Sequence, residues 1–172
     1  MIPVDGHRRY PVRRKEAAPI DPSVTHGVVV VVERGGRYLM VRRASGVVAP
    51  GAWCFVGGAL EPGESEEQAV IREFHEEVGG RVRPLRRVWE YVRPDGKLRL
   101  YWWRAELLDP PAADLRPNPA EVAELRWCTP GEMQELPDLL ESNRQFLAVL
   151  RRRAPNTGLD GGPDHCHNCN PG

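Results

Sequence analysis

The stretch that decides the fold covers residues 58–80 and reads GALEPGESEEQAVIREFHEEVGG. Its second part predicts a helix over 65–78, because Ser65 and Gln68 form a capping box and Gly79 supplies a stop. The apolar residues of this segment recur at helical spacing and predict a core face made of Val70, Ile71, Phe74 and Val78. The helix therefore packs through one face and leaves its polar residues to carry chemistry.

Acidic residues crowd the second half of this helix. Glu73, Glu76 and Glu77 stand at i, i+3 and i+4, where like charges oppose each other by roughly 0.2–0.5 kcal/mol per pair. The last two also precede the helix end, where the macrodipole disfavours anions by about 0.3–1 kcal/mol. A divalent cation would relieve this repulsion, and oxygen ligands alone favour a hard ion, Mg²⁺ or Mn²⁺.

Composition limits the classes of protein that this chain can belong to. Its 172 residues suit one domain, and 24 basic against 24 acidic residues create no global field for nucleic acid. No stretch approaches the ~20 apolar residues of a membrane span, and the first residues lack a secretory core. We therefore expect a cytoplasmic protein without membrane partners. Cys54 and Cys128 lie in apolar, strand-like segments, which predicts reduced core thiols.

The chain divides into three parts. Residues 1–22 mix five basic side chains with prolines and predict a flexible basic arm, whereas 23–153 predict the folded domain. Residues 154–172 are rich in Gly and Pro and predict a disordered tail. Cys166 and Cys169 in this tail have the spacing of zinc ligands, but a second cysteine pair is absent, which favours adventitious metal binding.

Further elements follow from apolar patterning and turn residues. We expect one hairpin at 26–32 with 38–42 and a second at 82–92 with 98–108. Two more extended segments are expected at 52–56 and 121–128, and a last helix at about 138–152.

The stretch at 58–80 closely resembles the Nudix box. That pattern is Gly, five residues, Glu, seven residues, Arg-Glu, an apolar residue, any residue, Glu-Glu, any residue, Gly and an apolar residue. The matching positions are Gly58, Glu64, Arg72, Glu73, Phe74, Glu76, Glu77 and Gly79. Gly80 departs from the pattern, because the family usually has an aliphatic side chain there. The resemblance extends over most of 24–152 and implies an α/β fold of the α+β kind, an α/β/α sandwich with a mixed β-sheet.

The resemblance also implies the roles of the box residues. The implied metal ligands are Gly57, through its carbonyl, and Glu73, Glu76 and Glu77. Glu73 is in addition a candidate for positioning or deprotonating the attacking water. Arg72 is expected to orient the neighbouring carboxylates through Glu76 or Glu64, and Glu64 is a helper in catalysis.

Some relatives use a further glutamate outside the box, shortly before a late tryptophan. Glu121 precedes Trp127 at such a distance and is the candidate here, with Glu124 as its rival. The general base therefore stays open among Glu73, Glu121 and Glu124. Edge-strand charges without a catalytic role are the alternative for the last two.

Basic and aromatic residues near the box are candidates for substrate contact. Arg42 and Arg43 end the second strand and are candidates for binding substrate phosphate, with a salt bridge as the alternative for each. Trp53, Phe55 and the rings at 101–103 offer stacking surfaces for a base, although core packing is the favoured interpretation.

The resemblance implies a metal-dependent pyrophosphohydrolase. It would cleave the diphosphate linkage of a nucleoside diphosphate derivative or a (d)NTP by attack of water at phosphorus, with a small nucleotide as its partner. A non-catalytic nucleotide sensor is disfavoured because no box glutamate is missing. An RNA 5′-end pyrophosphohydrolase is disfavoured because only the arm has a basic cluster, so we do not expect nucleic acid as a partner. Monomer and homodimer both suit the architecture, and loops at 44–51, 93–97 and 109–120 are expected to select the substrate.

Overall fold

The computed structural model describes residues 23–108 and 115–153. The predicted arm at 1–22 and the predicted tail at 154–172, with its two cysteines, lie outside the described residues and stay predictions. The strands are β1 (Thr25–Arg34), β2 (Arg37–Arg43), β3 (Trp53–Cys54), β4 (Val56–Ala59), β5 (Val82–Val92), β6 (Leu98–Leu107) and β7 (Val122–Cys128). The helices are α1 (Glu66–Val78), α2 (Pro130–Gln134) and α3 (Glu141–Arg153).

The two strands of the first hairpin diverge away from their turn, and residues of the box lie in the space between them. Strands β1 and β2 pair directly only beside their turn, where Glu33 faces Tyr38 and Arg34 faces Arg37. Farther along they diverge, so that β3 pairs with β2 and β4 pairs with β1. The chain thus crosses at Phe55 from one strand of the hairpin to the other, and β4 then carries Gly57 and Gly58 alongside β1.

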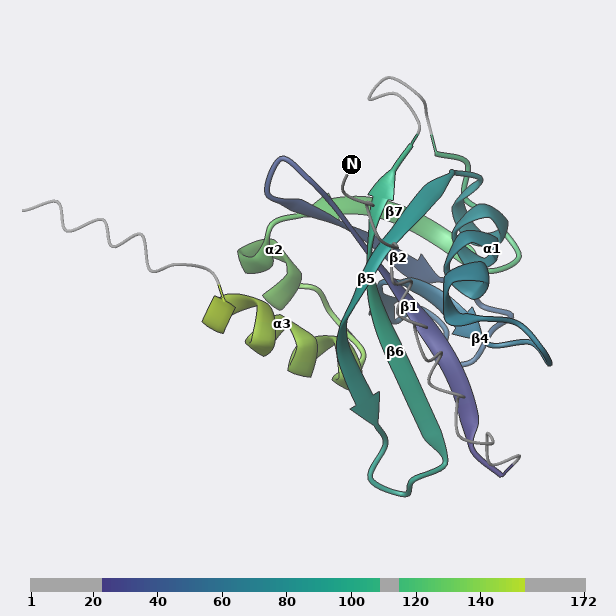
Figure 1. Cartoon of the computed structure of the whole chain (residues 1–172). Helices are drawn as coiled ribbons and strands as arrows, with labels where there is room; N and C mark the ends of the chain where they lie inside the picture. The colour runs from purple at the N-terminus through teal and green to yellow at the C-terminus, as the bar shows by residue number, and fades with distance from the viewer. Residues whose placement is uncertain (1–22, 109–114, 154–172) are drawn as a thin grey trace, which may run out of the picture.

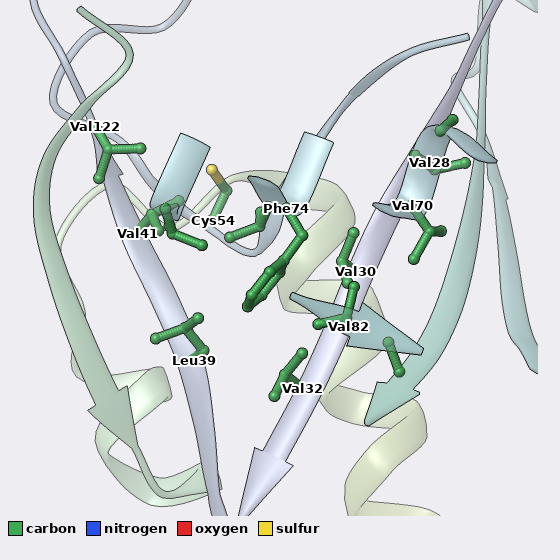
Figure 2. Packing of buried hydrophobic residues seen from close by; sticks show 14 residues of the cluster. Val28, Val30, Val32, Leu39, Val41, Cys54, Val70, Phe74, Val82 and Val122 are labelled. Carbon is green, nitrogen blue, oxygen red and sulfur yellow. The ribbon is translucent and has the colours of Figure 1, made fainter. Parts of the chain in front are cut away.

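Strand β1 is apolar on both faces because both faces are covered. Its even-numbered valines, such as Val30, pack with α1, and its odd-numbered valines, such as Val31, pack against the elements of α2 and α3. Figure 2 shows Phe74 of α1 between Leu39 of β2 and the valines of β1. Helices therefore lie on both sides of the strands (Figure 1). β1 and β6 are parallel while the other pairs are antiparallel, which confirms the predicted α/β/α sandwich with a mixed sheet.

Helix α1 begins and ends where the sequence predicts. The side chain of Ser65 accepts the Gln68 N–H, the reciprocal bond is present, and Gly79 closes the helix in the left-handed conformation. The predicted core face was wrong at Ile71, which is 47% exposed, whereas Ala69 is buried. At about 100° per residue the buried arc is centred on Val70, so Ile71 falls just outside it.

The departure from the family pattern at Gly80 has a packing reason. A Cβ at this position would lie 2.6 Å from Cδ2 of Leu115 and 2.6 Å from the ring of Phe74. Leu115 packs against the α1 core cluster in this space. We infer that a side chain from a distant loop fills the volume that an aliphatic residue at position 80 would otherwise take.

The remaining elements follow the predicted order with three differences. The extended segment predicted at 52–56 is divided at Phe55 into β3 and β4, which pair with different strands. The second hairpin and β7 agree with prediction, but the last helix begins at Glu141 because the preceding Leu139 and Leu140 pair with Trp53 of β3. The short helix α2 was missed, although Thr129 and Glu132 form a capping box around its first turn. Cys54 and Cys128 are buried and free, as predicted. Among the described helices, none is long and apolar enough to cross a membrane.

Candidate active site

A cavity of about 220 Å³ lies where β4, α1 and the segment before β7 meet. Its polar lining joins residues that are far apart in the sequence: Arg43, Gly57, Gly58, Glu73, Glu77 and Glu121. Two of these carboxylates come from α1 and the third comes from the other end of the domain. The fold therefore gathers three acidic side chains beside one basic side chain and a glycine pair.

Glycine at position 58 lets a carboxylate lie directly against the backbone. A Cβ there would sit 2.3 Å from Oε1 of Glu73, closer than side-chain atoms approach one another. The neighbouring Gly57 donates its N–H to Oε1 of Glu77 at 3.4 Å. The glycine pair of β4 thus forms one wall of the acidic cavity.

Burial strongly disfavours the charged forms of the two α1 carboxylates. Glu73 and Glu77 are 7% and 6% exposed. Burial raises the pKa of Glu77 to about 8, which the Gly57 N–H opposes and the charges of Glu73 and Glu121 reinforce. Burial also raises the pKa of Glu73, against the lowering effect of Arg72. A bound cation would oppose these shifts, and the hard oxygen donors of the cavity suit Mg²⁺ or Mn²⁺.

Arg72 joins the acidic residues of the box. It binds Glu64 through two hydrogen bonds of 2.8 Å, Oε1 of Glu73 at 2.8 Å and Oε2 of Glu76 at 3.1 Å. A fourth partner is the carbonyl of Ala59 at 3.0 Å. The hydrogen bonds that Arg72 donates to Glu64 lower the pKa of Glu64. The same bonds are the main cause of a raised pKa of Arg72, and the bonds to Glu73 and Glu76 add to it. Arg72 thus contacts both expected partners, Glu64 and Glu76, and Glu73 in addition.

Glu76 stands apart from the other two helix carboxylates. Its side chain is half-exposed, binds Arg72 and does not line the cavity. Glu73 and Glu77 lie inside the buried arc of α1, whereas Glu76 lies just outside its edge. Within residues 23–108 and 115–153, no three acidic, histidine or cysteine side chains form a ready metal-binding group.

The two arginines at the end of β2 go to different places. Arg43 lines the acidic cavity and donates its Nε–H to the carbonyl of Val48 at 2.6 Å. Arg42 points to the other face, where it lies 3.9 Å from Glu124 and donates to the carbonyl of Gly51. Strand alternation separates the pair, since Arg43 shares the face of Val41 and α1.

The two glutamates before Trp127 are also separated, because Glu121 lies in the turn before β7 and Glu124 lies within the strand. Glu121 lines the cavity with Glu73, whereas Glu124 lies on β7 and pairs with Arg126 at 2.6 Å. The proximity of Glu121 to the α1 carboxylates is also apparent in its raising effect on their pKa values. Glu121 is therefore the late glutamate that the tertiary structure places with the box.

A second cavity of about 520 Å³ adjoins the first and shares Arg43, Cys54 and the glycine pair with it. Its lining includes Ser142 and Asn143 of α3, which are buried and which sequence reasoning missed. Asn143 accepts the Phe55 N–H at 2.9 Å and donates to the Ser142 hydroxyl at 3.2 Å. The available signal was weak, because polar residues early in a helix are usually exposed.

The aromatic candidates are mainly core residues. Trp53, Phe55 and Trp102 are buried, as the favoured interpretation predicted, and Phe55 also lines the second cavity. Tyr101 and Trp103 are partly exposed; Arg87 lies over the Tyr101 ring, and Trp103 donates to Glu66 at 2.7 Å. Neither ring lines the two cavities.

Comparison with known proteins places this site in a family. Residues 22–150 match the NUDIX domain. The NAD-capped RNA hydrolase NudC of Stutzerimonas stutzeri (strain A1501) is 32% identical over 132 residues, which are 77% of this chain and 46% of that protein. The CTP pyrophosphohydrolase of Escherichia coli (strain K12) is 31% identical over 116 residues, which are 64% of this chain and 79% of that protein.

The fold comparison agrees with the sequence comparison. The crystal structure of a NUDIX hydrolase from Nitrosomonas europaea has a TM-score of 0.66 and 23% identity, and the match covers 78% of this chain and 74% of the other. This chain spans about half the length of the curated NudC relatives that it matches. The family match, in contrast, covers most of the chain and includes every residue of the acidic cavity. The chain therefore belongs to the NUDIX domain family of hydrolases.

Proposed function

We propose that this protein is a divalent-metal-dependent pyrophosphohydrolase that cleaves the diphosphate linkage of a small nucleotide by attack of water at phosphorus. The observation that carries this proposal is the pair of buried carboxylates, Glu73 and Glu77, in a cavity that adjoins a larger one. A negatively charged diphosphate would not enter such a cavity without a compensating cation.

The cation would be held by oxygen atoms of the box. We assign Glu73, Glu77 and the Gly57 carbonyl to it, with Glu76 as a further ligand from the edge of α1. When bound, a Mg²⁺ or Mn²⁺ ion supplies charge compensation and polarises a phosphoryl oxygen. Arg72 orients the glutamates through the hydrogen bonds that it donates to Glu73 and Glu76.

Other residues of the cavity act on the water and on the phosphate. We assign proton abstraction from the attacking water to Glu121, because Glu73 already accepts a hydrogen bond from Arg72 and Glu124 lies elsewhere. Arg43, the basic residue that lines both cavities, would bind a phosphate oxygen of the substrate. Arg42 has no such role in this proposal, since it faces Glu124.

The nucleoside would occupy the larger cavity. Its apolar walls include Val29, Phe55 and Leu100, which suit the faces of a base. Ser142 and Asn143 keep hydrogen-bonding capacity beyond the bonds they make to each other and to Phe55, so they would read the edge of that base. The CTP pyrophosphohydrolase relative supports a nucleoside triphosphate as the substrate class.

An RNA 5′ end is a second candidate substrate. The NudC relative is named as an NAD-capped RNA hydrolase, and the exposed Arg93 and Lys97 line the larger cavity beside the turn of the second hairpin. These two cations would contact phosphates beyond the one that is cleaved.

A substrate panel tests the proposal. Purified protein would be assayed for phosphate and pyrophosphate release from CTP, other (d)NTPs, ADP-ribose, NAD and NAD-capped RNA, with Mg²⁺, Mn²⁺ or EDTA. We expect one class of substrate to be hydrolysed, and only when a divalent metal ion is present. Glu77→Gln should lower the hydrolysis rate at least about 100-fold. The control is Glu124→Gln, which removes a carboxylate outside the cavity and should keep activity within about twofold. Turnover in EDTA, or full activity of Glu77→Gln, would contradict the proposal.

A further inference from the structure

Glu121 reaches the acidic cavity from outside α1 and needs its own support. It lies in the turn that precedes β7, and its backbone carbonyl accepts the Ala44 N–H at 2.8 Å. We propose that Asn118 is a positioning residue that holds the Glu121 carboxylate in the cavity, an inference that rests on the proposed function for its catalytic consequence.

The backbone of Asn118 ties this turn to the end of the acidic helix. Its N–H donates to the Glu77 carbonyl at 2.8 Å, and the Arg116 N–H donates to the Val78 carbonyl at 2.8 Å. These bonds satisfy carbonyls at the C-terminal end of α1, which have no partner within the helix. The carbonyl of Asn118 in turn accepts the N–H groups of Glu121 at 3.0 Å and Val122 at 2.8 Å. One residue thus connects the helix of Glu77 to the start of β7.

The side chain of Asn118 completes the arrangement with both ends of its amide. Oδ1 accepts the Ala120 N–H at 3.1 Å, which is an Asx turn, and Nδ2 donates to Oε1 of Glu121 at 3.3 Å. Pro119 suits the second position of this turn because its φ is already fixed near the required value. Oδ1 of Asn118 therefore stabilises the turn, and Nδ2 orients the carboxylate of Glu121.

Among small side chains, asparagine alone meets both requirements. Aspartate at position 118 would keep the acceptor for the Ala120 N–H but would place a carboxylate oxygen against Glu121. Serine would keep a shorter acceptor and would lose the donor that reaches Glu121. The neutral amide therefore orients Glu121 and leaves its negative charge in place.

The matched variant is Asn118→Asp, which preserves size, backbone contacts and the Asx turn. We expect kcat to fall about 10- to 100-fold, the range found for partners that orient site residues, while KM for the nucleotide changes less than about threefold. In a Glu121→Gln background the same substitution should lower kcat no further, since both changes act through one carboxylate. Glu124→Gln serves as the control in both backgrounds.

A second readout does not depend on activity. In metal-free protein with ¹³C-labelled glutamate side chains, Glu121→Gln identifies the Glu121 carboxyl resonance. Asn118→Asp should shift that resonance more than those of Glu73 and Glu77. An unmoved Glu121 resonance, an unchanged kcat, or a full further loss in the Glu121→Gln background would each overturn the inference. If the resonance shifts but wild-type protein hydrolyses no substrate, the positioning contact stands and the proposed function fails.

Discussion

Helices α1 and α3 cover opposite faces of the same strands, yet they bury polar side chains of different kinds. Across the described residues, the buried polar or charged side chains are Glu73 and Glu77 on α1 and Ser142 and Asn143 on α3. The α3 pair is neutral, and it makes one hydrogen bond within the pair and one to the Phe55 N–H. The α1 pair carries like charges whose ionised forms burial disfavours.

The difference shows which face depends on a ligand. A neutral buried pair with hydrogen-bond partners contributes to stability without outside help, at about 0.5–1.5 kcal/mol per bond. A buried pair of carboxylates loses stability when it ionises unless positive charge is supplied. Arg72 supplies part of that charge to Glu73, whereas the polar contact of Glu77 is the Gly57 N–H at 3.4 Å. Under the proposed function, the α1 face would hold a cation, whereas the α3 face would contact an uncharged part of the substrate.

The largest expected effect is on catalysis, where substitutions on the α1 face and on the α3 face should differ. Glu73→Gln should lower kcat/KM by at least about 100-fold, because it removes a carboxylate proposed to bind the metal. Ser142→Ala should lower it by about tenfold or less, since it removes one hydrogen-bonding group from the larger cavity. Steady-state kinetics with the best substrate measures both. A larger loss in Ser142→Ala than in Glu73→Gln would reverse the assignment of the two faces.

The next effect is the pH dependence of stability without metal. The folded-state pKa of Glu77 is about 8, against about 4.5 in the unfolded chain, so the folded state retains a proton that the unfolded state releases between these values. Stability should therefore decline as pH rises from about 4.5 to 8. Glu77→Gln should reduce that decline, leaving the part that is due to Glu73, and should stabilise the protein at pH 9 by on the order of 1–3 kcal/mol.

Urea unfolding in EDTA at several pH values measures this dependence. Ser142→Ala is the matched control, because it changes a buried polar residue that does not titrate in this range. An equal slope in wild type and Glu77→Gln would show that Glu77 ionises freely in the folded state.

A smaller effect is expected on the α3 face. Asn143→Ala leaves the buried Phe55 N–H without its acceptor, which should cost about 1–3 kcal/mol of stability at every pH between 5 and 9. Asn143→Asp keeps an acceptor for that N–H and should restore part of the loss at low pH. Thermal unfolding of both variants provides the measurement. A pH-dependent loss in Asn143→Ala would indicate coupling to a titrating group and would weaken the contrast between the helices.

The smallest effect concerns the border of the α1 face. Ile71→Ser should change the free energy of unfolding by no more than about 0.5 kcal/mol, because Ile71 is 47% exposed. Val70→Ala, one residue away, should cost more, because Val70 is fully buried in the core cluster. Chemical denaturation distinguishes the two. A larger loss in Ile71→Ser would place Ile71 in the core after all.

Local sequence signals predicted the elements well because their causes are local. The capping box at Ser65, the stop at Gly79 and the turn residues of both hairpins act within a few residues. The missed helix α2 also had a local signal, the capping box of Thr129 and Glu132. The start of α3 was predicted too early for a non-local reason, because Trp53 of β3 forms backbone hydrogen bonds with the residues just before the helix.

The candidate site was predictable in its residue types and less so in its geometry. Spacing along the sequence singled out Glu73, Glu76 and Glu77, and the tertiary structure places Glu73 and Glu77, but not Glu76, in one cavity with Glu121. Sequence alone did not decide whether Arg42 or Arg43, or whether Glu121 or Glu124, belongs to the site. Neighbouring strand positions point to opposite faces, and the sequence does not say which face receives α1.

The amino-acid sequence by itself determined the acidic helix, the glycines that precede it and the family to which the chain belongs, because these depend on short-range spacing. Tertiary structure alone decided which carboxylates are buried, which arginine joins them and that Asn118 contacts Glu121. Burial and proximity arise when β1 and β2 diverge and distant segments pack into the opening. Because electrostatic energies depend on that burial, the chemistry of the site became visible only in the folded chain.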